Sequence, residues 1–421
     1  MKYTILLLTL ISACFSSNAQ NCDYTLPKYN TSSEMDVVYG ISPTFDGSQD
    51  TLRMNIFKPI GDFNDKRPLI VFVHGGGWTG GDKDDANPNC NLYAQRGFVA
   101  ITIDYRLGFF PDTINGFYPY IYDENELERV IFRGMQDTKG AIRFMKARNS
   151  IDSSDVNTTV LWGGSAGGFI ALATTYLNKS SEKPNSCYTA SSTIYGPRPD
   201  LGSTEGTLNI NGYNTNITAV ANCFGGITDT SLIESKNDPP IFNYHQTLDS
   251  VVSCYHDQVF WEVGLGYADN YPNVMGSCAI GQHLTNLSYA SNRAQELIYT
   301  GLGTPYGHGF HDFVLVDSLT TAFYNNHICE NSLSIDSKNN IQNIKVYPNP
   351  FNSSTKLNFN TYIEGGKLSI YDINGIKVKK IDRVFGRELI IYKENLSNGI
   401  YYLSIDTSDG NHLRGKLIVI K

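Results

Sequence analysis

The stretch VLWGGSAGGFIALATTY, residues 160–176, decides the fold. An apolar run leads to one serine between two pairs of glycines, and a run of helical character follows. Residues 163–167 fit the pattern G-x-S-x-G, in which a sharp turn from a strand into a helix exposes the Ser165 side chain as a nucleophile. The serine backbone is strained there, so small neighbours are needed for the strand and the helix to pack closely. An ordinary glycine-rich turn fits the same letters, so the rest of the chain has to decide.

Strands and helices alternate on both sides of this turn. Short apolar runs in residues 68–78, 98–107 and 158–164 predict buried strands. Apolar residues at helical spacing in residues 126–149 and 168–177 predict helices. The alternation predicts an α/β fold, a mostly parallel sheet with helices on both faces. Active sites in such sheets lie at the carboxyl ends of the strands.

The last part of the chain has a different character. Polar residues 330–344 predict a linker, and residues 345–421 alternate apolar and polar residues between turn signals. These signals are Asn374-Gly375, Asn398-Gly399 and Asp409-Gly410. The pattern predicts a small all-β sandwich domain. Its tyrosines either pack in the core or form an exposed binding face; they are Tyr371, Tyr392, Tyr401 and Tyr402.

The N-terminus predicts export. Lys2 precedes a short apolar core, and Ser17-Asn18-Ala19 offers small residues for cleavage, so residues 1–19 are expected to be a signal peptide. A lipoprotein signal that would retain Cys14 is the alternative. The predicted mature chain begins at Gln20, and residues 20–329 form the predicted α/β domain. No later segment is apolar and long enough to predict a transmembrane helix.

Charge and cysteine content narrow the function further. The 421 residues carry a formal net charge of −8 without a strong basic run, which argues against nucleic-acid binding. Of the eight cysteines, seven lie after residue 19, so at least one thiol has no partner within the chain. We expect a bridge between Cys254 and Cys278, because both flank the loop of the candidate acid. No C-x-x-C spacing supports a zinc ribbon.

A serine nucleophile needs a base and an acid that orients the base, and in this fold they follow the serine in the order acid, then histidine. Asp249 follows a predicted strand and is the candidate acid, with Asp257 as the alternative. A turn aspartate that caps the next segment would look similar. His308 lies between glycines near the end of the α/β region and is the candidate base. His311 is the alternative.

The glycines of HGGGW, residues 74–78, are candidates for stabilising an oxyanion. Glycines at a strand end let backbone N–H groups converge on one point, so Gly76 and Gly77 are assigned this role. The N–H group of Ala166, directly after the nucleophile, is their expected partner. His74 precedes the serine within this loop, which makes it a weaker candidate for the base.

Residues 37–327 resemble an α/β-hydrolase of the carboxylesterase type, including the feruloyl-esterase-like and hormone-sensitive-lipase-like groups. The resemblance implies a nucleophile at Ser165, an acid at Asp249 and a base at His308. The chain departs from the usual pattern at His245-Gln246, where His-Gly is common. The matching pieces are LRMNIFKP, PLIVFVHGGGWTGGDKDD, IDYRLG, QDTKGAIRFMKAR, WGGSAGGFIAL, DPPIFNYHQTLDSVV and YGHGF.

Residues 345–421 resemble the type A C-terminal sorting domain of type IX secretion, through VYPNPF, LSIYDINGIKVKKI, LSNGIYYLSI and GKLIVIK. This resemblance implies that the secretion machinery is a partner of the chain. It also implies passage through the outer membrane, followed by release or attachment at the surface.

Together these features predict a secreted serine ester hydrolase that acts through an acyl-enzyme, without a metal or an organic cofactor. The expected substrates are esters of short acyl groups or esters linked to carbohydrate, with acetyl or feruloyl groups. A prolyl-oligopeptidase-like peptidase, a lipase and a non-catalytic surface binding protein are the alternatives. Polar residues 201–237 are either an insertion that partly roofs the site or a surface loop without a role in substrate choice.

Overall fold

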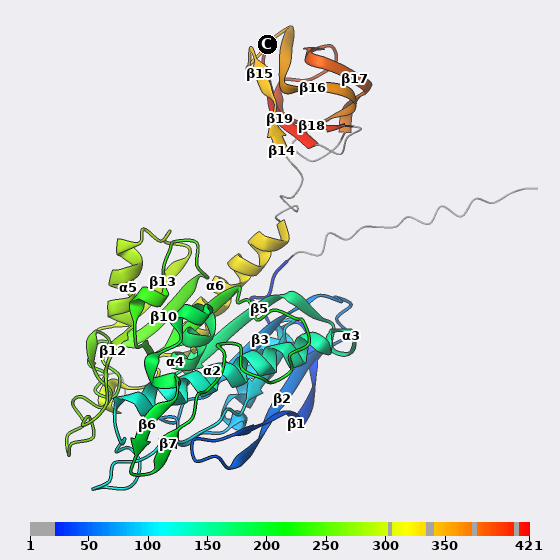
Figure 1. Ribbon diagram of the computed structural model, residues 1–421. Coiled ribbons are helices and arrows are strands. Elements are labelled where there is room, and N and C mark those ends of the chain that lie inside the picture. Colours follow the sequence, from blue (N-terminus) through cyan, green and yellow to red (C-terminus); the bar gives the residue numbers. More distant parts are fainter. Residues whose placement is uncertain (1–21, 302–304, 334–340, 373–376, 408–411) are drawn as a thin grey trace, which may run out of the picture. The chain divides into compact units, whose positions relative to one another are not determined.

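The computed structural model describes residues 22–301, 305–333, 341–372, 377–407 and 412–421 (Figure 1). The predicted signal peptide, Cys14 and the turns at Asn374-Gly375 and Asp409-Gly410 lie outside the described residues. Contacts divide the chain into two compact units between Asn331 and Ser332, and each unit is described by itself. No helix in the described part of the chain is both long and apolar enough to cross a membrane.

The first unit is built on an eight-stranded sheet with the order β1-β2-β4-β3-β5-β8-β10-β13. From β4 to β13 all neighbouring strands are parallel, whereas β1 and β2 pair antiparallel at one edge. The strands are β1 (Asn30–Pro43), β2 (Gln49–Ile60), β3 (Arg67–Val73), β4 (Val99–Ile103), β5 (Ser154–Gly164), β8 (Ala219–Cys223), β10 (Ile241–Gln246) and β13 (Ala294–Tyr299).

Helices cover both faces of this sheet (Figure 1). Leu69, Val71 and Val73 of β3 belong to one core, which includes apolar residues of α2 (Glu124–Ala147), α4 (Ala166–Tyr176) and α5 (Ser277–Asn286). Ile70 and Phe72 belong to the other core, with residues of α1 (Asn87–Gln95) and α6 (Phe313–Leu333). Successive side chains of a strand point to opposite faces of the sheet. A strand such as β3, which is covered by helices on both faces, is therefore apolar on both of its sides.

This sheet order, with a strand–turn–helix unit at its centre, is the α/β-hydrolase fold, as predicted. Short elements connect the main ones. They are α3 (Asn149–Asp152), β6 (Ala190–Thr193), β7 (Gly196–Arg198), β9 (Gly226–Ile227), β11 (His256–Gln258) and β12 (Asn273–Gly276).

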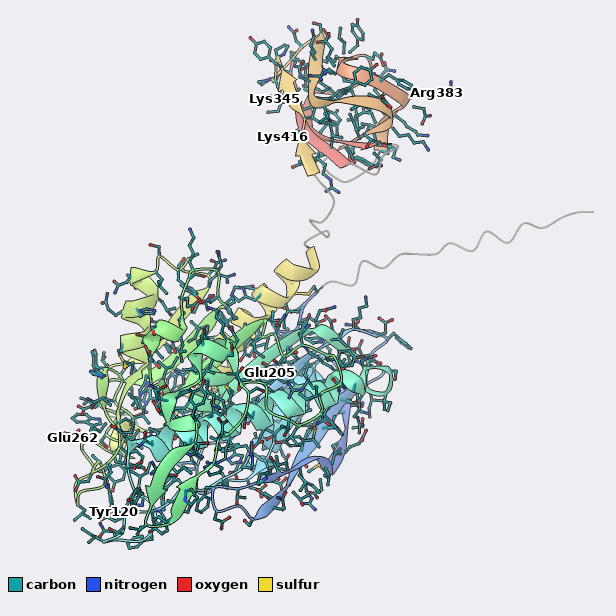
Figure 2. The ribbon with its side chains drawn as sticks, viewed as in Figure 1. Tyr120, Glu205, Glu262, Lys345, Arg383 and Lys416 are labelled. Atoms are coloured by element: carbon teal, nitrogen blue, oxygen red, sulfur yellow. A yellow bond between two sulfur atoms is a disulfide. The ribbon has the colours of Figure 1, made fainter. Side chains whose placement is uncertain are left out.

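The interpretation of residues 201–237 as one insertion or loop is wrong, because β8 lies within them and is a fully buried strand of the central sheet. The polar residues before β8 run along α2 instead. Glu205, which is labelled in Figure 2, forms ion pairs with Lys139 (2.9 Å) and Arg143 (3.0 Å) of that helix. This segment therefore covers the outer face of α2, which explains why two basic side chains of the helix are almost fully buried.

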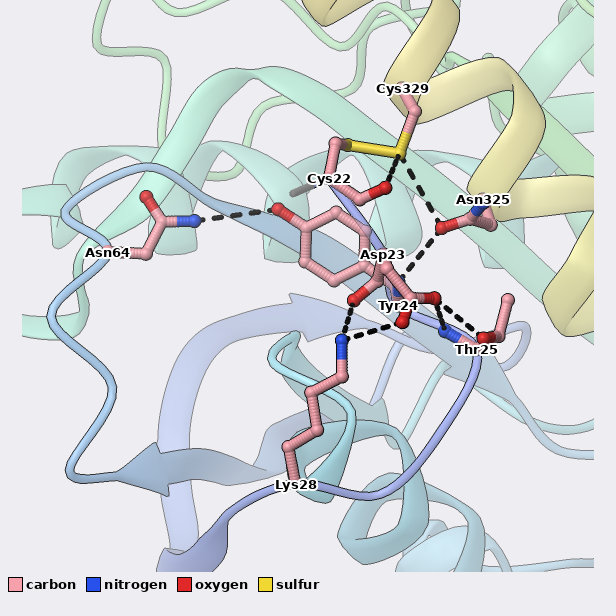
Figure 3. The surroundings of a disulfide bond; sticks show 8 residues. All are labelled: Cys22, Asp23, Tyr24, Thr25, Lys28, Asn64, Asn325 and Cys329. Atoms are coloured by element: carbon pink, nitrogen blue, oxygen red, sulfur yellow. Dashed lines mark hydrogen bonds and ion pairs between the residues drawn. A yellow bond between two sulfur atoms is a disulfide. The ribbon is translucent and has the colours of Figure 1, made fainter. Parts of the chain in front are cut away.

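Two disulfides join distant parts of the first unit. Cys254 is bonded to Cys278, as predicted. Cys22 is bonded to Cys329 of α6, which the sequence did not predict (Figure 3). Nearby, the N–H group of Tyr24 donates to the side chain of Asn325 (2.8 Å), so the start of the described chain is held on α6 by more than the covalent link. Among the described cysteines, the unpaired thiols are buried; they belong to Cys90, Cys187 and Cys223.

The second unit is an all-β domain. Its sheet has the order β14-β19-β18-β16-β15, with β17 also paired to β16, and all pairs except β14–β19 are antiparallel. The strands are β14 (Ile341–Asn343), β15 (Lys345–Tyr347), β16 (Ser354–Tyr371), β17 (Lys377–Tyr392), β18 (Gly399–Thr407) and β19 (His412–Val419). The long β16 pairs with β15 near its start and with β18 near its end, so the sheet wraps around one apolar core.

The tyrosines of the second unit divide between core and surface. Tyr401 is buried and Tyr371 is half-buried, whereas Tyr392 and Tyr402 are exposed. The cations Lys345, Arg383 and Lys416 also lie on the surface of this unit (Figure 2).

Candidate active site

Ser165 stands at the turn between β5 and α4 with φ 54° and ψ −126°. A positive φ is unfavourable for any residue with a side chain, and it persists only where the surrounding structure enforces it. The N–H group of Ser165 donates to the Cys223 carbonyl (2.9 Å) at the end of β8. The turn is thus held by the neighbouring strand as well as by the helix that follows.

Three glycines around Ser165 leave no room for a side chain. A Cβ atom on Gly163 would lie 2.1 Å from the Gly167 carbonyl oxygen, and one on Gly167 would lie 2.1 Å from the Val73 carbonyl oxygen. A Cβ atom on Gly168 would lie 2.5 Å from Asn222 Oδ1. These contacts explain three of the four paired glycines: around Gly163 and Gly167, β3, β5 and α4 approach each other backbone to backbone.

We expect Gly167→Ala to lower the free energy of unfolding by about 3 kcal/mol, because its Cβ atom meets the backbone of β3. Gly164→Ala is the matched control, since a Cβ atom there has its nearest contact at 3.4 Å. Urea denaturation of the two variants measures the difference. Equal midpoints would show that β3 does not limit the size of this turn.

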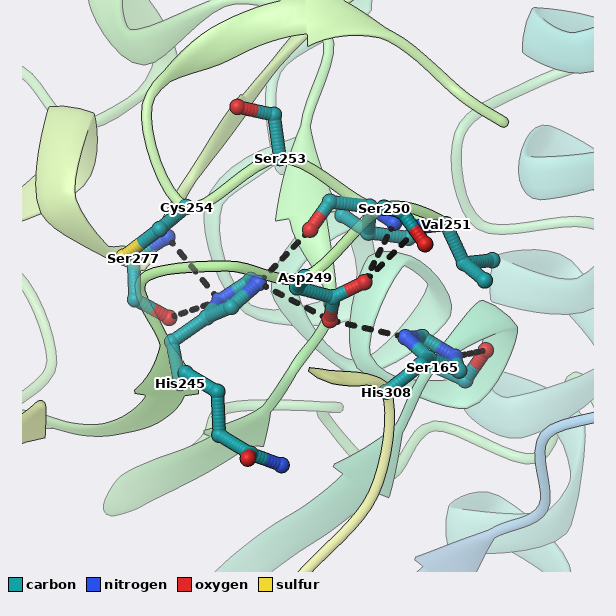
Figure 4. A network of polar contacts seen from close by, with 12 residues as sticks. Ser165, His245, Asp249, Ser250, Val251, Ser253, Cys254, Ser277 and His308 are labelled. Carbon is teal, nitrogen blue, oxygen red and sulfur yellow. Dashed lines mark hydrogen bonds and ion pairs between the residues drawn. The ribbon is translucent and has the colours of Figure 1, made fainter. Parts of the chain in front are cut away.

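The structure brings Ser165, His308 and Asp249 together from three separate segments (Figure 4). His308 Nε2 lies 2.8 Å from Ser165 Oγ, and His308 Nδ1 lies 2.8 Å from Asp249 Oδ2. A carboxylate only accepts, so Nδ1 carries the proton and Nε2 is free to accept from the serine hydroxyl. This is the arrangement that a serine nucleophile and its base require.

The loop of Asp249 and the segment of His308 fit together through their backbones. Gly307 has φ 66°, and a Cβ atom there would lie 2.4 Å from the Leu248 carbonyl oxygen. The N–H group of Ser250 donates to the Tyr306 carbonyl (2.8 Å). A glycine is therefore required before His308 for the histidine to reach the acid.

Asp249 is fully buried, and both of its carboxylate oxygens accept hydrogen bonds. Oδ1 accepts from the N–H groups of Val251 and Val252, each at 2.9 Å. Burial raises the pKa of Asp249, but hydrogen bonds from His245 and His308 outweigh burial and leave this pKa below its usual value. The carboxylate is therefore ionised at neutral pH.

The alternative candidates for the base, His74 and His311, and for the acid, Asp257, lie in other surroundings. The His74 ring stacks on Tyr105 (4.5 Å between centroids), and its Nδ1 donates to the Gly75 carbonyl (2.7 Å). Burial lowers the pKa of His74. The His311 ring stacks on Tyr299 (3.9 Å). Asp257 lies in β11, where its carboxylate accepts from the N–H group of Gln258 (2.9 Å).

The glycine loop after β3 runs beside the serine. A Cβ atom on Gly75 would lie 3.2 Å from Ser165 Cβ. Gly76 and Gly77 have φ of 109° and 57°, and a Cβ atom on Gly76 would lie 2.2 Å from the Gly80 carbonyl oxygen. Ala166 is the first residue of α4, so its N–H group belongs to the positive end of that helix.

A cavity of about 390 Å³ opens at Ser165. Its walls are mainly aromatic, with a polar side formed by His74, Asp85 and Asn89. The aromatic side chains are Trp162, Phe224, Phe310 and Phe313. No residue of 201–216 lines this cavity.

Residues 109–121 and 259–271 pack against each other, a contact that the sequence did not predict. Tyr120 Oη donates to the Leu265 carbonyl (3.1 Å), and Tyr271 Oη donates to the Pro119 carbonyl (2.8 Å). Tyr118 lies against Gly77, because a Cβ atom on this glycine would be 2.5 Å from Tyr118 Oη. The high aromatic content of residues 109–122 was the available signal.

Within the described residues, no group of three or more His, Cys, Asp or Glu side chains could hold a metal ion.

The fold, with a serine at the strand–helix turn and a histidine–aspartate pair beside it, is that of the α/β-hydrolase class of proteins. In a comparison with known families, residues 15–185 match the model of the carboxylesterase family. Residues 345–421 match the model of the secretion system C-terminal sorting domain. This second match indicates that the protein is secreted or attached at the outer surface.

Curated relatives share only part of the chain. Carboxylesterase 3B of Mus musculus is 32% identical over 124 residues, which are 29% of this chain and 20% of the relative. Gut esterase 1 of Caenorhabditis briggsae is 31% identical over 121 residues, 28% of this chain and 20% of the relative. The chain thus spans about a fifth of the length of the curated relatives it matches.

Solved structures with a related fold are distant. A truncated form of a carbohydrate esterase from gut microbiota is 17% identical with a TM-score of 0.46, and the alignment covers 72% of this chain and 97% of that one.

Proposed function

We propose that this protein is a secreted serine ester hydrolase in which Ser165 is the nucleophile, His308 the base and Asp249 the residue that orients the base. The observation that carries the proposal is the continuous hydrogen-bonded chain from Ser165 Oγ through His308 to the buried Asp249 carboxylate. The carboxylesterase-family match of residues 15–185 supports the same activity.

The proposed reaction has two stages. Ser165 Oγ attacks the ester carbonyl while His308 Nε2 takes its proton, and His308 then gives this proton to the leaving alcohol. Water, activated by His308, releases the acid from the acyl-enzyme. The N–H groups of Gly76, Gly77 and Ala166 are proposed to stabilise the oxyanion.

Short acyl groups or carbohydrate-linked esters with acetyl or feruloyl groups are the proposed substrates. The cavity of about 390 Å³ supports a small acyl group, because its volume is near the lower end of the range for ligand pockets. Its aromatic walls are compatible with a planar acyl group, and its side with Asp85 and Asn89 suits a hydroxylated one.

The proposed domains follow the two units. Residues 20–329 would carry the reaction and residues 345–421 would engage the type IX secretion machinery as partner. The segment 330–344 between them contains the end of α6 and the strand β14 of the second unit's sheet. The sorting-domain match over residues 345–421 supports this last role.

We expect the full mature chain, produced under oxidising conditions, to hydrolyse p-nitrophenyl acetate and butyrate faster than a long-chain ester. Methyl ferulate and acetylated xylan test the carbohydrate-linked class. A preference for the long-chain ester would make the protein a lipase, and cleavage of peptide amides alone would make it a peptidase. A folded chain that hydrolyses none of these would contradict the proposed activity.

A further inference from the structure

A second histidine lies on the far side of the Asp249 carboxylate from His308 (Figure 4). His245 Nε2 is 3.3 Å from Asp249 Oδ2, the same oxygen that accepts from His308 Nδ1 at 2.8 Å. His245 and Asp249 are both fully buried. None of the three roles proposed above accounts for a histidine at this place.

The hydrogen bonds of His245 determine which of its nitrogens carries the proton. Nε2 is 2.8 Å from the Val252 carbonyl oxygen, which only accepts, so Nε2 is protonated. Nδ1 is 2.9 Å from Ser277 Oγ, and the N–H group of Ser277 also points to Nδ1 at 3.4 Å. A backbone N–H only donates, so Nδ1 accepts. His245 is therefore a neutral ring with its single N–H directed to Val252 and Asp249.

Ser277 is itself fixed in place. Its neighbour Cys278 is bonded to Cys254, and the N–H group of Cys278 donates to the Cys254 carbonyl (2.7 Å). Asn222 of β8 donates to Ser277 Oγ (3.3 Å). The disulfide thus holds the serine whose hydroxyl selects the tautomer of His245.

We propose that His245 is a positioning residue, whose Nε2–H holds the Asp249 carboxylate in the orientation that accepts the proton of His308 Nδ1. The inference rests on the proposed function. Two backbone N–H groups anchor Oδ1, and without a donor from the other side Oδ2 would be held by His308 alone. His245 and His308 are the titratable side chains that act on this carboxylate.

The departure at Gln246 fits this arrangement. The Gln246 side chain donates to the Gly309 carbonyl (2.8 Å), which follows His308 directly. The end of β10 thus contacts the Asp249 carboxylate through His245, and it contacts the segment of His308 through Gln246.

The test compares His245→Leu, which removes the donor at similar volume, with His245→Gln, which keeps an N–H donor at the end of a side chain of similar length. The first readout is kcat and KM for p-nitrophenyl acetate. We expect His245→Leu to lower kcat about tenfold to a hundredfold, as for the loss of one hydrogen bond to a charged group, with KM unchanged. His245→Gln is expected to recover most of this loss.

The second readout does not need turnover. A proton held between His308 Nδ1 and a carboxylate gives a low-field NMR resonance, absent in His308→Gln. We expect this resonance to shift or broaden in His245→Leu and to return in His245→Gln. His327→Leu is the matched control. His327 lies on α6 and is also buried, and its Nε2 is hydrogen-bonded to a backbone carbonyl oxygen, that of Asn292 (2.9 Å).

Ser277→Ala is a second variant that tests the inference if His245→Leu does not fold. It removes only the hydroxyl that donates to Nδ1, and we expect the same direction of change in both readouts, with a fall in kcat of about tenfold or less. Wild-type kcat with an unchanged resonance in folded His245→Leu, or in Ser277→Ala if the former does not fold, would overturn the inference and leave the proposed function standing. A wild-type chain without esterase activity whose resonance depends on His245 would overturn the function and keep the positioning role.

Discussion

Ser165→Ala is expected to lower kcat/KM for p-nitrophenyl acetate by about 10⁶-fold, which is the typical effect of removing a serine nucleophile. The hydroxyl contacts His308 Nε2, and without it no atom at this turn can form the acyl-enzyme. The backbone at φ 54° is as strained for alanine as for serine, so the fold and the unfolding midpoint should change little.

The rate is best measured with freshly purified full chain, beside Ser186→Ala as the control. Ser186 is buried, and its Oγ donates to Glu128 (2.5 Å), away from the cavity lined by Ser165. We expect the control to keep its activity. A Ser165→Ala chain that retains even a hundredth of the wild-type rate would exclude Ser165 as the nucleophile.

Asp249→Asn is expected to lower kcat about 10⁴-fold by reversing the proton arrangement of His308. The N–H groups of Val251 and Val252 point to Oδ1, so the amide oxygen of asparagine takes that position. Its NH₂ group then faces His308 Nδ1, which must accept instead of donate. The proton moves to His308 Nε2, and this nitrogen can no longer accept from Ser165.

Asp257→Asn is the control for this substitution, because Asp257 was the alternative acid in the sequence. Its carboxylate accepts from the neighbouring N–H group of Gln258 rather than from a histidine. The expected kcat is near that of the wild type. Loss of activity in Asp257→Asn with a functional Asp249→Asn would exchange the two assignments.

The parts of this protein that the sequence predicted are those encoded within a few neighbouring residues. The turn at Ser165 is visible because three backbones meet where only glycine fits, and the buried strand β3 is visible as an unbroken apolar run. Steric limits and burial of this kind restrict which residue can stand at each position, so the fold class could be predicted from the sequence.

Contacts between distant segments were harder to predict. β8 stands in the centre of the sheet, yet polar residues on both sides hid it in an apparent insertion. The contact between residues 109–121 and 259–271 depends on hydrogen bonds that join segments about 150 residues apart, as between Tyr271 and Pro119 (separation 152). Aromatic residues mark such segments as buried somewhere, but not against which partner.

The same limit applies to the disulfides. Cys254 and Cys278 are 24 residues apart and flank one loop, so their pairing could be predicted, whereas Cys22 and Cys329 are separated by 307 residues. The role of His245 was hidden for a related reason, because its tautomer depends on Ser277, which is 32 residues away.

The bond between Cys22 and Cys329 also determines how the first unit carries mechanical load. It closes residues 22–329 of the first unit into a covalent ring. Tension applied between the chain before Cys22 and the chain after α6 passes across the sulfur bridge and leaves the ring between the two cysteines unloaded. We therefore expect Phe313, at the start of α6, to keep its place in the wall of the cavity at Ser165 when the two ends of the chain are pulled apart.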